Sequence, residues 1–521
     1  MWREKKLEGG IAMDQKFAII DLGSNSIRVI IMKVYQDGSY KMLDQAKEMV
    51  RLSEKMGDEN TLKPLAIQRT ISALKLFKKL IEAHKVDKVI TVATAAVRNA
   101  ANQQFFLDKV KIETGYEFTV ISGEDEGYYD YVGVINTIDI DNCVIIDTGG
   151  ASTEFILVEN RRMKNVVSLP YGAVVLTEKF QPKDDNGSDR CKAIQASTEE
   201  FMQKQLANIP WLEQAKGLPV VGVGGAIRTL AKIDKKKIGF PLESLHNYQL
   251  SADEVTAAYD KVANTSAEDR KNIPGVSKDR ADIIAAGLVP VKSLMDYLQS
   301  DKLVISGNGL REGVFFKAYL KACGYKDEIV ENVLIHSIEN TLKNYDANIT
   351  HSYQVQKLAL SLFDQLKKLH DFGDDIRKLL YASALLHDIG MYVDYYNHHK
   401  HGFYLVLNSR INGLTNKELV MCAFIVGMHE NEDFKQNWKE YELLINKSDY
   451  EVIKKLSLFV RIAEKLDRNE YGSIEDVVCY ITDDSVQMMV KSNNSPDLEI
   501  AAAMKNNKTF EKLFDKELYI V

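Results

Sequence analysis

Long apolar runs are missing from this 521-residue sequence. No stretch approaches the roughly 20 consecutive apolar residues that a membrane-spanning helix needs. Arg3, Lys5 and Lys6 lie near the N-terminus, but no apolar segment typical of a signal peptide follows them. We therefore expect neither a membrane protein nor a secreted one. Met13 lies just before the first predicted strand, so translation starting at Met1 or at Met13 is left open, and the first twelve residues are a candidate extension.

Cysteine is scarce and basic residues are not in excess. The five cysteines lie far apart and form no CxxC pair, which excludes a disulfide framework and favours buried thiols in the cytoplasm. The 67 basic and 74 acidic side chains give a net charge of −7. This balance argues against nucleic-acid binding over the whole surface, because phosphate neutralisation needs clustered Lys and Arg. A local basic channel is still compatible with it.

The order of apolar segments predicts an α/β protein with a helical C-terminal part. Apolar side chains at helical spacing predict a helix over 65–84. Runs typical of strands lie at 17–20, 27–34, 89–93, 118–121, 144–146, 155–158, 220–223 and 303–305. Beyond about residue 325 the pattern becomes helical, and eight of the ten histidines lie between His336 and His429. Two strands are predicted again at 477–481 and 486–490.

One pattern occurs twice in the first half. The segments IIDLGSNSIRVII (19–31) and IIDTGGASTEFIL (145–157) each contain a strand ending in Asp, a small polar loop and a second strand. The repeat predicts two related halves that face each other. Loops of small residues let backbone N–H groups converge on phosphate oxygens, and carboxylates at their edges can hold Mg²⁺. Asp21, Asp147 and Glu154 are the predicted metal ligands.

The sequence resembles the exopolyphosphatase/guanosine pentaphosphate phosphatase family. The two loops resemble that family's phosphate loops, with Ala151 where a third Gly is usual. Further matching segments follow in the family's order: TAAVR (94–98), ISGEDEG (121–127), VGVGGAIRTL (221–230), IPGVSKDRADII (273–284) and SGNGLREGV (306–314). The resemblance implies an α/β fold with two actin-like (ribonuclease H-like) domains of the actin and sugar-kinase group, at 13–135 and 136–315. It also implies an all-α HD-like domain at 325–470 and a small α+β domain at 471–521.

The resemblance places the family's catalytic carboxylate on Glu126. Hydrolysis of a phosphoanhydride needs a base that orients and deprotonates water. A purely structural interpretation also exists, because Ser122 and Asp125 form a capping-box pattern and acidic residues favour a first helical turn. We interpret Glu126 as the general base and Asp125 as the capping residue.

The predicted phosphate contacts come from both loops and from two arginines, because the guanidinium group donates two hydrogen bonds to one phosphate. The predicted contacts are Gly23, Ser24, Asn25, Ser26, Gly149, Gly150, Ala151, Ser152, Thr153, Arg98 and Arg280. Surface ion pairs are the structural alternative for the arginines, and Arg311 beside Glu312 fits an internal ion pair equally well. The turn at 222–228 lacks the spacing of a dinucleotide fingerprint, and contact with a nucleotide is left open there.

The helical part carries a possible second metal site, which the resemblance to HD-type phosphohydrolases implies. Its candidate ligands are His351, His387, Asp388, His398, His429 and Glu464. Glu464 lies where the HD pattern has Asp, while Asp467 is retained three residues later. Imidazole and carboxylate together suit a transition metal. The alternatives are histidines without a metal role and cations that line a substrate channel.

Together these features predict an Mg²⁺-dependent, processive exopolyphosphatase that releases orthophosphate from inorganic polyphosphate, as a homodimer. Hydrolysis of the 5′-terminal phosphate of guanosine pentaphosphate is the alternative within the same chemistry. A kinase or nucleotide-driven chaperone of the same fold group, and a sensor that binds phosphate or an alarmone, are alternatives of other classes. Neither nucleic acid nor membrane is an expected partner.

Overall fold

The computed structural model describes residues 13–57, 59–180, 188–430 and 434–521, with side chains of the 188–207 helix from residue 194 onward. The candidate extension at residues 1–12 lies outside the described residues. The chain divides into two compact units, one through Glu331 and one over Asn332–Val521, and each is described by itself. None of the described helices combines the length and apolar character needed to cross a bilayer. Cys143, Cys323, Cys422 and Cys479 are free thiols.

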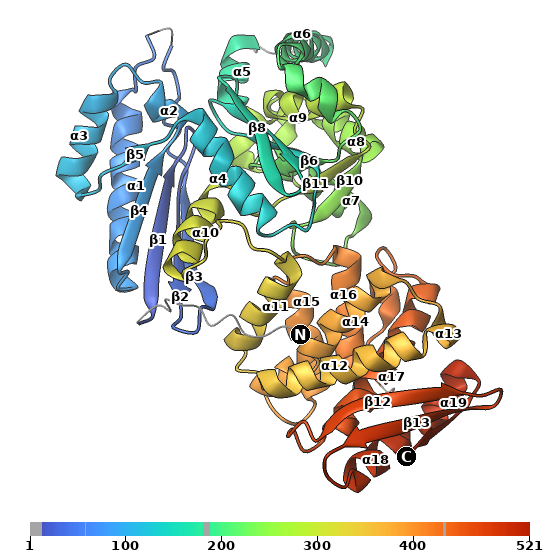
Figure 1. The fold of residues 1–521 in the computed structure, drawn as a ribbon. Helices are drawn as coiled ribbons and strands as arrows, with labels where there is room; N and C mark the ends of the chain where they lie inside the picture. The colour runs from blue at the N-terminus through green and yellow to red at the C-terminus, as the bar shows by residue number, and fades with distance from the viewer. Residues whose placement is uncertain (1–12, 58, 181–187, 431–433) are drawn as a thin grey trace. The chain divides into compact units, whose positions relative to one another are not determined.

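Two mixed sheets organise the N-terminal unit (Figure 1). The first has the order β3-β2-β1-β4-β5, with β1 (Gln15–Leu22), β2 (Ile27–Val34), β3 (Tyr40–Glu48), β4 (Lys88–Ala93) and β5 (Thr119–Val120). The second has the order β10-β11-β9-β6-β7-β8, with β6 (Cys143–Thr148), β7 (Thr153–Glu159), β8 (Arg162–Leu169), β9 (Val220–Val223), β10 (Tyr248–Ser251) and β11 (Lys302–Ile305). Each predicted strand position of this unit falls on one of these strands.

The two sheets share one topology, which confirms the predicted pair of related halves. An antiparallel meander, β1-β2-β3 in one and β6-β7-β8 in the other, is followed by two parallel strands next to its first strand. β10 adds an antiparallel edge to the second sheet. In each half, the first hairpin ends in one of the Gly/Ser loops.

Helices cover both sheets and form the greater part of the C-terminal unit. In the N-terminal unit they are α1 (Pro64–Ala83), α2 (Ala95–Arg98), α3 (Gln103–Thr114), α4 (Gly123–Ile135), α5 (Ala173–Phe180), α6 (Ser188–Ala207), α7 (Ile227–Ile238), α8 (Ala252–Ala263), α9 (Ile284–Leu298) and α10 (Leu310–Ala322). Helix α1 buries the stripe that includes Ile67, Leu74 and Phe77 against the first sheet, which confirms the helix predicted at 65–84.

The C-terminal unit is largely helical, as predicted, and it also contains the small sheet that the sequence analysis assigned to a separate domain at 471–521. Its helices are α11 (Val333–Asn344), α12 (Ile349–Gln365), α13 (Lys367–His370), α14 (Asp374–Leu386), α15 (His398–Asn408), α16 (Asn416–Met428), α17 (Lys447–Leu466), α18 (Asp497–Ala503) and α19 (Asn507–Phe514). Its sheet has the order β12-β13-β14, with β12 (Ile474–Ile481), β13 (Ser485–Ser492) and β14 (Glu517–Ile520). β12 packs on α12, and α18 packs on α17, so the C-terminal strands and helices belong to the same compact unit.

Helices α4 and α10 cross each other between the two sheets (Figure 1). α4 packs against β7 and β8 of the second sheet, whereas α10 packs against β1 of the first. Glycines permit the crossing: a Cβ at Gly313 would lie 1.9 Å from the carbonyl oxygen of Tyr129, and one at Gly133 would lie 2.4 Å from that of Gly309. Backbone therefore meets backbone at this point, and neither side has a flexible side chain that can move away.

We expect the substitution Gly313→Ala to destabilise the N-terminal unit, because the added methyl group must push α10 away from α4. Overpacking of this kind typically costs about 1–3 kcal/mol of unfolding free energy. Denaturant unfolding of the full chain measures the change, with Lys321→Ala on the exposed end of α10 as the matched control. Equal stability of the two variants would contradict the tight crossing.

Candidate functional site

A cleft in the N-terminal unit is formed by both Gly/Ser loops. The loops have matching turns, with the Gly23 N–H donating to the Ser26 carbonyl (3.2 Å) and the Gly149 N–H donating to the Ser152 carbonyl (3.0 Å). A Cβ at Gly150 would lie 2.9 Å from Cβ of Ser24, so the loops approach each other closely. The cleft is lined by Asp21, Gly23, Ser24, Asn25, Ser26, Arg28, Thr94, Glu126, Asp147, Thr148, Gly149, Gly150, Ser152, Ala173, Gly224, Gly225, Ala226, Arg280, Ile283, Ile284 and Leu310.

Ala151 and Thr153, both predicted phosphate contacts, are buried in the second loop and are not among these lining residues. The Thr153 hydroxyl donates to the carbonyl of Tyr171 (2.8 Å). These two residues therefore support the loop from behind, whereas Gly149, Gly150 and Ser152 line the cleft.

Three carboxylates predicted to bind metal lie at the loop edges. Asp21 is paired with Arg28 across β1 and β2, and Asp147 is paired with Glu154 across β6 and β7. Glu154 is buried and accepts a hydrogen bond from the Ser168 hydroxyl (2.7 Å) through Oε1. Among the described residues, Oδ1 of Asp147 and Oε2 of Glu154 are buried without a hydrogen-bond partner. Two such oxygens on neighbouring strands suit a hard divalent cation.

Burial controls the protonation of these acids. It raises the pKa of Glu154 to about 8, with a further contribution from the nearby charge of Asp147. It raises the pKa of Asp147 to about 6 against the opposing effect of Arg228. A bound cation would favour the ionised carboxylates, because it supplies the positive charge that this part of the cleft has too little of.

Glu126 lies on α4 and faces the cleft with only 8% of its surface exposed. Burial raises its pKa well above the ordinary range, and the charges of Glu154 and Asp147 raise it further. Arg98 opposes this shift through an ion pair in which Nη1 lies 3.2 Å from Oε2 of Glu126. Asp125 closes the predicted capping box with Ser122. The two neighbouring acids therefore have separate environments, one at the helix end and one in the cleft.

Arg98 is not among the cleft-lining residues, although it was predicted as a phosphate contact. The same Nη1 that faces Glu126 also donates to the carbonyl of Ile121 (2.8 Å). Both acceptors hold the guanidinium group on the side of α4, where it positions Glu126. Its contact with a phosphate therefore stays a prediction.

Half-buried arginines supply positive charge in and beside the cleft. Burial and the charge of Arg28 together lower the pKa of Arg228 and of Arg280 to about 10. The Arg280 guanidinium lies directly over Gly225, where a Cβ would be 1.9 Å from Nη1. Arg28 itself lines the cleft, and burial beside Arg311 lowers its pKa as well. Guanidinium groups close to one another favour a polyanionic ligand, because each donates hydrogen bonds to phosphate oxygens.

Arg28 and Asp130 are site residues that the sequence analysis missed. Arg28 interrupts the apolar strand IRVIIMKV, and this interruption was the available signal. Asp130 lies one helical turn after Glu126 and is fully buried, and neither of its oxygens has a hydrogen-bond donor among the described residues. Burial raises its pKa, and Asp147 is the charge that adds most to this shift. Asp130 is thus a fifth acid near the cleft, after Asp21, Glu126, Asp147 and Glu154.

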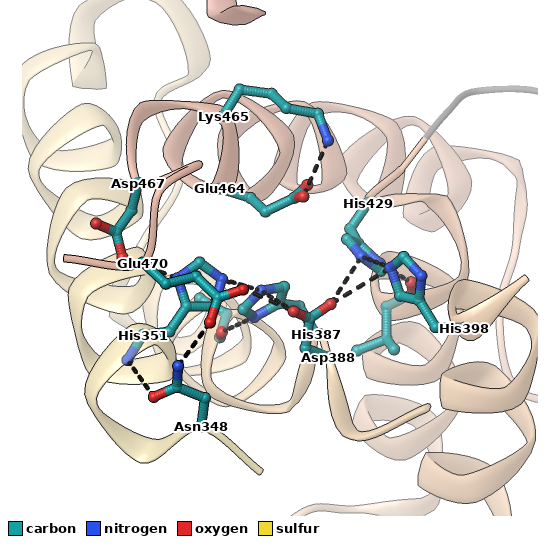
Figure 2. Close-up of polar contacts among 12 residues, drawn as sticks. Asn348, His351, His387, Asp388, His398, His429, Glu464, Lys465, Asp467 and Glu470 are labelled. Atoms are coloured by element: carbon teal, nitrogen blue, oxygen red, sulfur yellow. Dashed lines mark hydrogen bonds and ion pairs between the residues drawn. The ribbon is translucent and has the colours of Figure 1, made fainter. Parts of the chain in front are cut away.

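The histidines predicted to bind metal meet in the C-terminal unit (Figure 2). Asp388 lies between two histidine pairs, one formed by His351 and His387 and the other by His398 and His429. The sixth predicted ligand, Glu464, forms an ion pair with Lys465 (2.9 Å) through Oε1. Asp467 instead accepts a hydrogen bond from Nδ1 of His351 (2.8 Å). The structure thus brings the five ligands other than Glu464 into direct contact.

Solved structures of known proteins share the fold of the N-terminal unit. A Ppx/GppA family member from Aquifex aeolicus is 32% identical, with a TM-score of 0.50, over 59% of this chain and 98% of its own. An exopolyphosphatase from Cytophaga hutchinsonii is 22% identical, with a TM-score of 0.55, over 60% of this chain and 99% of its own, and this likeness concerns the fold alone.

Curated relatives extend the likeness into the C-terminal unit. A guanosine-5′-triphosphate,3′-diphosphate pyrophosphatase from Pseudoalteromonas atlantica is 27% identical over 82% of this chain and 83% of its own length. The protein of the same name from Vibrio vulnificus is 29% identical over 78% of this chain and 79% of its own length. Residues 30–322 match the model of the Ppx/GppA phosphatase family, and residues 333–510 match that of Ppx/GppA phosphatase, domain III. The chain belongs to the Ppx/GppA phosphatase family.

Proposed function

We propose that this phosphatase is an Mg²⁺-dependent exopolyphosphatase that removes terminal phosphates from inorganic polyphosphate. As a family member it hydrolyses phosphoanhydride bonds. The observation that carries the choice of substrate is the half-buried group Arg28, Arg228 and Arg280, of which Arg28 and Arg280 line the cleft together with the two Gly/Ser loops. A chain of phosphates matches this group, because each phosphate along the chain brings negative charge to the cations.

In the proposed mechanism the loops bind the terminal phosphate through backbone N–H groups, and the arginines neutralise the phosphates behind it. Glu126 accepts a proton from the attacking water, and Arg98 holds the carboxylate toward the cleft. Asp21, Asp147 and Glu154 would hold Mg²⁺, whose chemistry when bound is to neutralise charge on the phosphate oxygens. The unpartnered oxygens of Asp147 and Glu154 support this assignment.

Two features favour a polymer over a nucleotide. First, none of the residues lining the described cleft is aromatic, so no ring is available there to stack on a guanine base. Second, positive charge continues beyond the arginines. Burial and the charge of Arg280 lower the pKa of Lys47 to about 8, and burial and the charge of Arg228 lower the pKa of Lys232. Two further cations thus lie near the group, where later phosphates of a chain would pass.

Hydrolysis of guanosine pentaphosphate is the second candidate function. The names of the Pseudoalteromonas and Vibrio relatives favour it, since they match about four fifths of this chain. Both substrates end in a phosphoanhydride, so the same loops and the same base would serve either. We further infer an HD-like domain in the C-terminal unit from its buried His-Asp group. The homodimer and the cytoplasmic location stay predictions of the family resemblance.

The substitution Glu126→Gln removes the proposed base while leaving the side-chain shape. Positioned general bases contribute typically 10²–10⁴-fold, so we expect orthophosphate release from long-chain polyphosphate with Mg²⁺ to fall by about that factor. Glu124→Gln, two residues earlier on α4, is the matched control and should retain the wild-type rate. A gel of the remaining polymer should show full-length chains beside free phosphate, as expected of processive removal.

Two outcomes would contradict this assignment. Retention of the wild-type rate by Glu126→Gln would remove Glu126 from the chemistry and point to a different base. Wild-type protein that leaves polyphosphate intact but hydrolyses guanosine pentaphosphate would replace the polymer by the nucleotide as substrate.

The pH dependence tests the ion pair between Arg98 and Glu126. A base acts in its ionised form, so kcat/KM should rise with pH through the pKa of Glu126. The Arg98 charge lowers that pKa. Arg98→Met should therefore shift the acidic limb of the kcat/KM profile to higher pH. At pH values below the shifted pKa of Glu126, the rate of the variant should be lower than that of the wild type. The exposed Arg162→Met is the control, and an unshifted limb in Arg98→Met would rule out the positioning role of Arg98.

A further inference from the structure

The buried His-Asp group of the C-terminal unit has the arrangement of a site for two metal ions. We propose that it binds a pair of divalent transition-metal cations, with Asp388 as the bridging ligand, His351 and His387 on one cation, and His398 and His429 on the other. This site is separate from the proposed Mg²⁺ site, and the inference does not depend on the proposed substrate.

The first argument is the state of the four imidazole rings. In each ring, Nδ1 lies within hydrogen-bonding distance of a carboxylate or backbone carbonyl oxygen. Such an oxygen can only accept a hydrogen bond. The contacts are His351 Nδ1 to Oδ2 of Asp467 (2.8 Å), His387 Nδ1 to the Ala384 carbonyl (2.8 Å), His398 Nδ1 to the Tyr395 carbonyl (3.0 Å) and His429 Nδ1 to the Val426 carbonyl (2.6 Å). The proton of each neutral ring is therefore on Nδ1, and Nε2 presents a lone pair. Metal-binding histidines are held in this way by their outer neighbours.

The second argument is how the Nε2 atoms face one another. Nε2 of His351 lies 3.3 Å from Nε2 of His387, and Nε2 of His398 lies 3.0 Å from Nε2 of His429. Two lone pairs at this separation repel, and His387 and His429 have no exposed surface through which water would reach them. Two nitrogens bound to one cation at about 2.1 Å lie roughly 3.0–3.4 Å apart. Both observed separations fit that range.

The position of Asp388 provides the bridge (Figure 2). Its Oδ2 lies 3.7 Å from Nε2 of His351 and 3.5 Å from Nε2 of His387. Its Oδ1 lies 3.3 Å from Nε2 of His398 and 3.5 Å from Nε2 of His429. One oxygen thus faces each histidine pair, and a carboxylate in this position can bind two cations at once.

A fifth buried histidine of the same unit shows the contrasting, purely structural state. Nε2 of His370 contacts the carbonyl of Phe363 (2.8 Å), while its Nδ1 accepts from the N–H of Phe372 (2.9 Å). Both ring nitrogens of His370 are therefore satisfied by backbone. The four histidines around Asp388 differ from it because their Nε2 atoms converge on one another and on a carboxylate.

The ligand set also indicates the class of metal. Imidazole nitrogens with one shared carboxylate suit Mn²⁺, Fe²⁺, Co²⁺ or Zn²⁺, whereas Mg²⁺ prefers oxygen ligands and retained water. Glu464 offers a further ligand, because its Oε2 is buried without a hydrogen-bond partner among the described residues. The Glu464 carboxylate also lies close enough to interact electrostatically with both His387 and His429.

Manganese binding to the full chain tests the proposal. The protein is stripped with a chelator, loaded with Mn²⁺ and desalted, and retained metal is counted by mass spectrometry while electron paramagnetic resonance detects coupling between ions. We expect at least two retained ions per chain, since the proposed Mg²⁺ site can also hold Mn²⁺, and a spin-coupled spectrum from the pair around Asp388. Asp388→Asn should lose the coupled signal and weaken retention by at least about tenfold, since even outer-shell changes cost 10–100-fold in affinity.

Three controls separate this site from other effects. His401→Ala, on the same helix as His398, should behave as wild type. Asp147→Asn should keep the spin-coupled signal, because it changes only the proposed Mg²⁺ site of the N-terminal unit. Circular dichroism shows whether Asp388→Asn is folded, and His387→Gln provides a second variant should it not be. Retention of fewer than two ions by wild type, or a coupled signal unchanged in both variants, would overturn the proposal, as would two retained ions without coupling.

Discussion

Partial burial of charged side chains at one place is the constraint on which the catalytic cleft depends. Arg228 and Arg280 each lie close enough to Arg28 for its charge to lower their pKa values, and all three arginines are half-buried. The acids Asp147 and Glu154 lie on neighbouring strands. A buried charge without a partner is strongly unfavourable. Asp147 opposes the pKa shifts of all three arginines, yet burial still lowers their pKa values, so a bound polyanion and a cation would relieve the desolvation of both sets of charges. This relief is the physical basis of the proposed substrate and cofactor.

The rest of the N-terminal unit holds these charges in place. The two hairpins fix the loops, and the glycine crossing of α4 with α10 fixes the helix that carries Glu126. Arg51 donates to Oδ2 of Asp282 (3.0 Å) and to the carbonyl of Asp279, which secures the segment around Arg280. The charged groups cannot separate without breaking such contacts, so the scaffold resists their repulsion.

Local patterns were enough to predict part of this arrangement. Three features depend only on a few neighbouring residues, and the structure contains all of them: the two Gly/Ser loops, the helix at 65–84 and the capping box at Ser122. Arg28 and Asp130 were missed because one charged residue inside a strand or helix has the same local pattern whether it faces solvent or a cleft. Contacts between residues far apart in the sequence could not be predicted from local patterns either. An example is the hydrogen bond between His351 and Asp467, which are 116 positions apart. Strands β3 and β8 carry charged, partly exposed residues and gave no apolar run to detect.

The central claim is that the half-buried arginines Arg28, Arg228 and Arg280 bind a chain of phosphates. Calorimetric titration of Glu126→Gln with polyphosphate of defined length and Mg²⁺ measures this binding without hydrolysis. Adding Arg280→Gln should weaken the affinity by roughly 10–100-fold, since a hydrogen bond to a charged group contributes about 1.5–3 kcal/mol, whereas adding the exposed Arg162→Gln should leave it unchanged. Equal affinity in all three proteins would contradict the account.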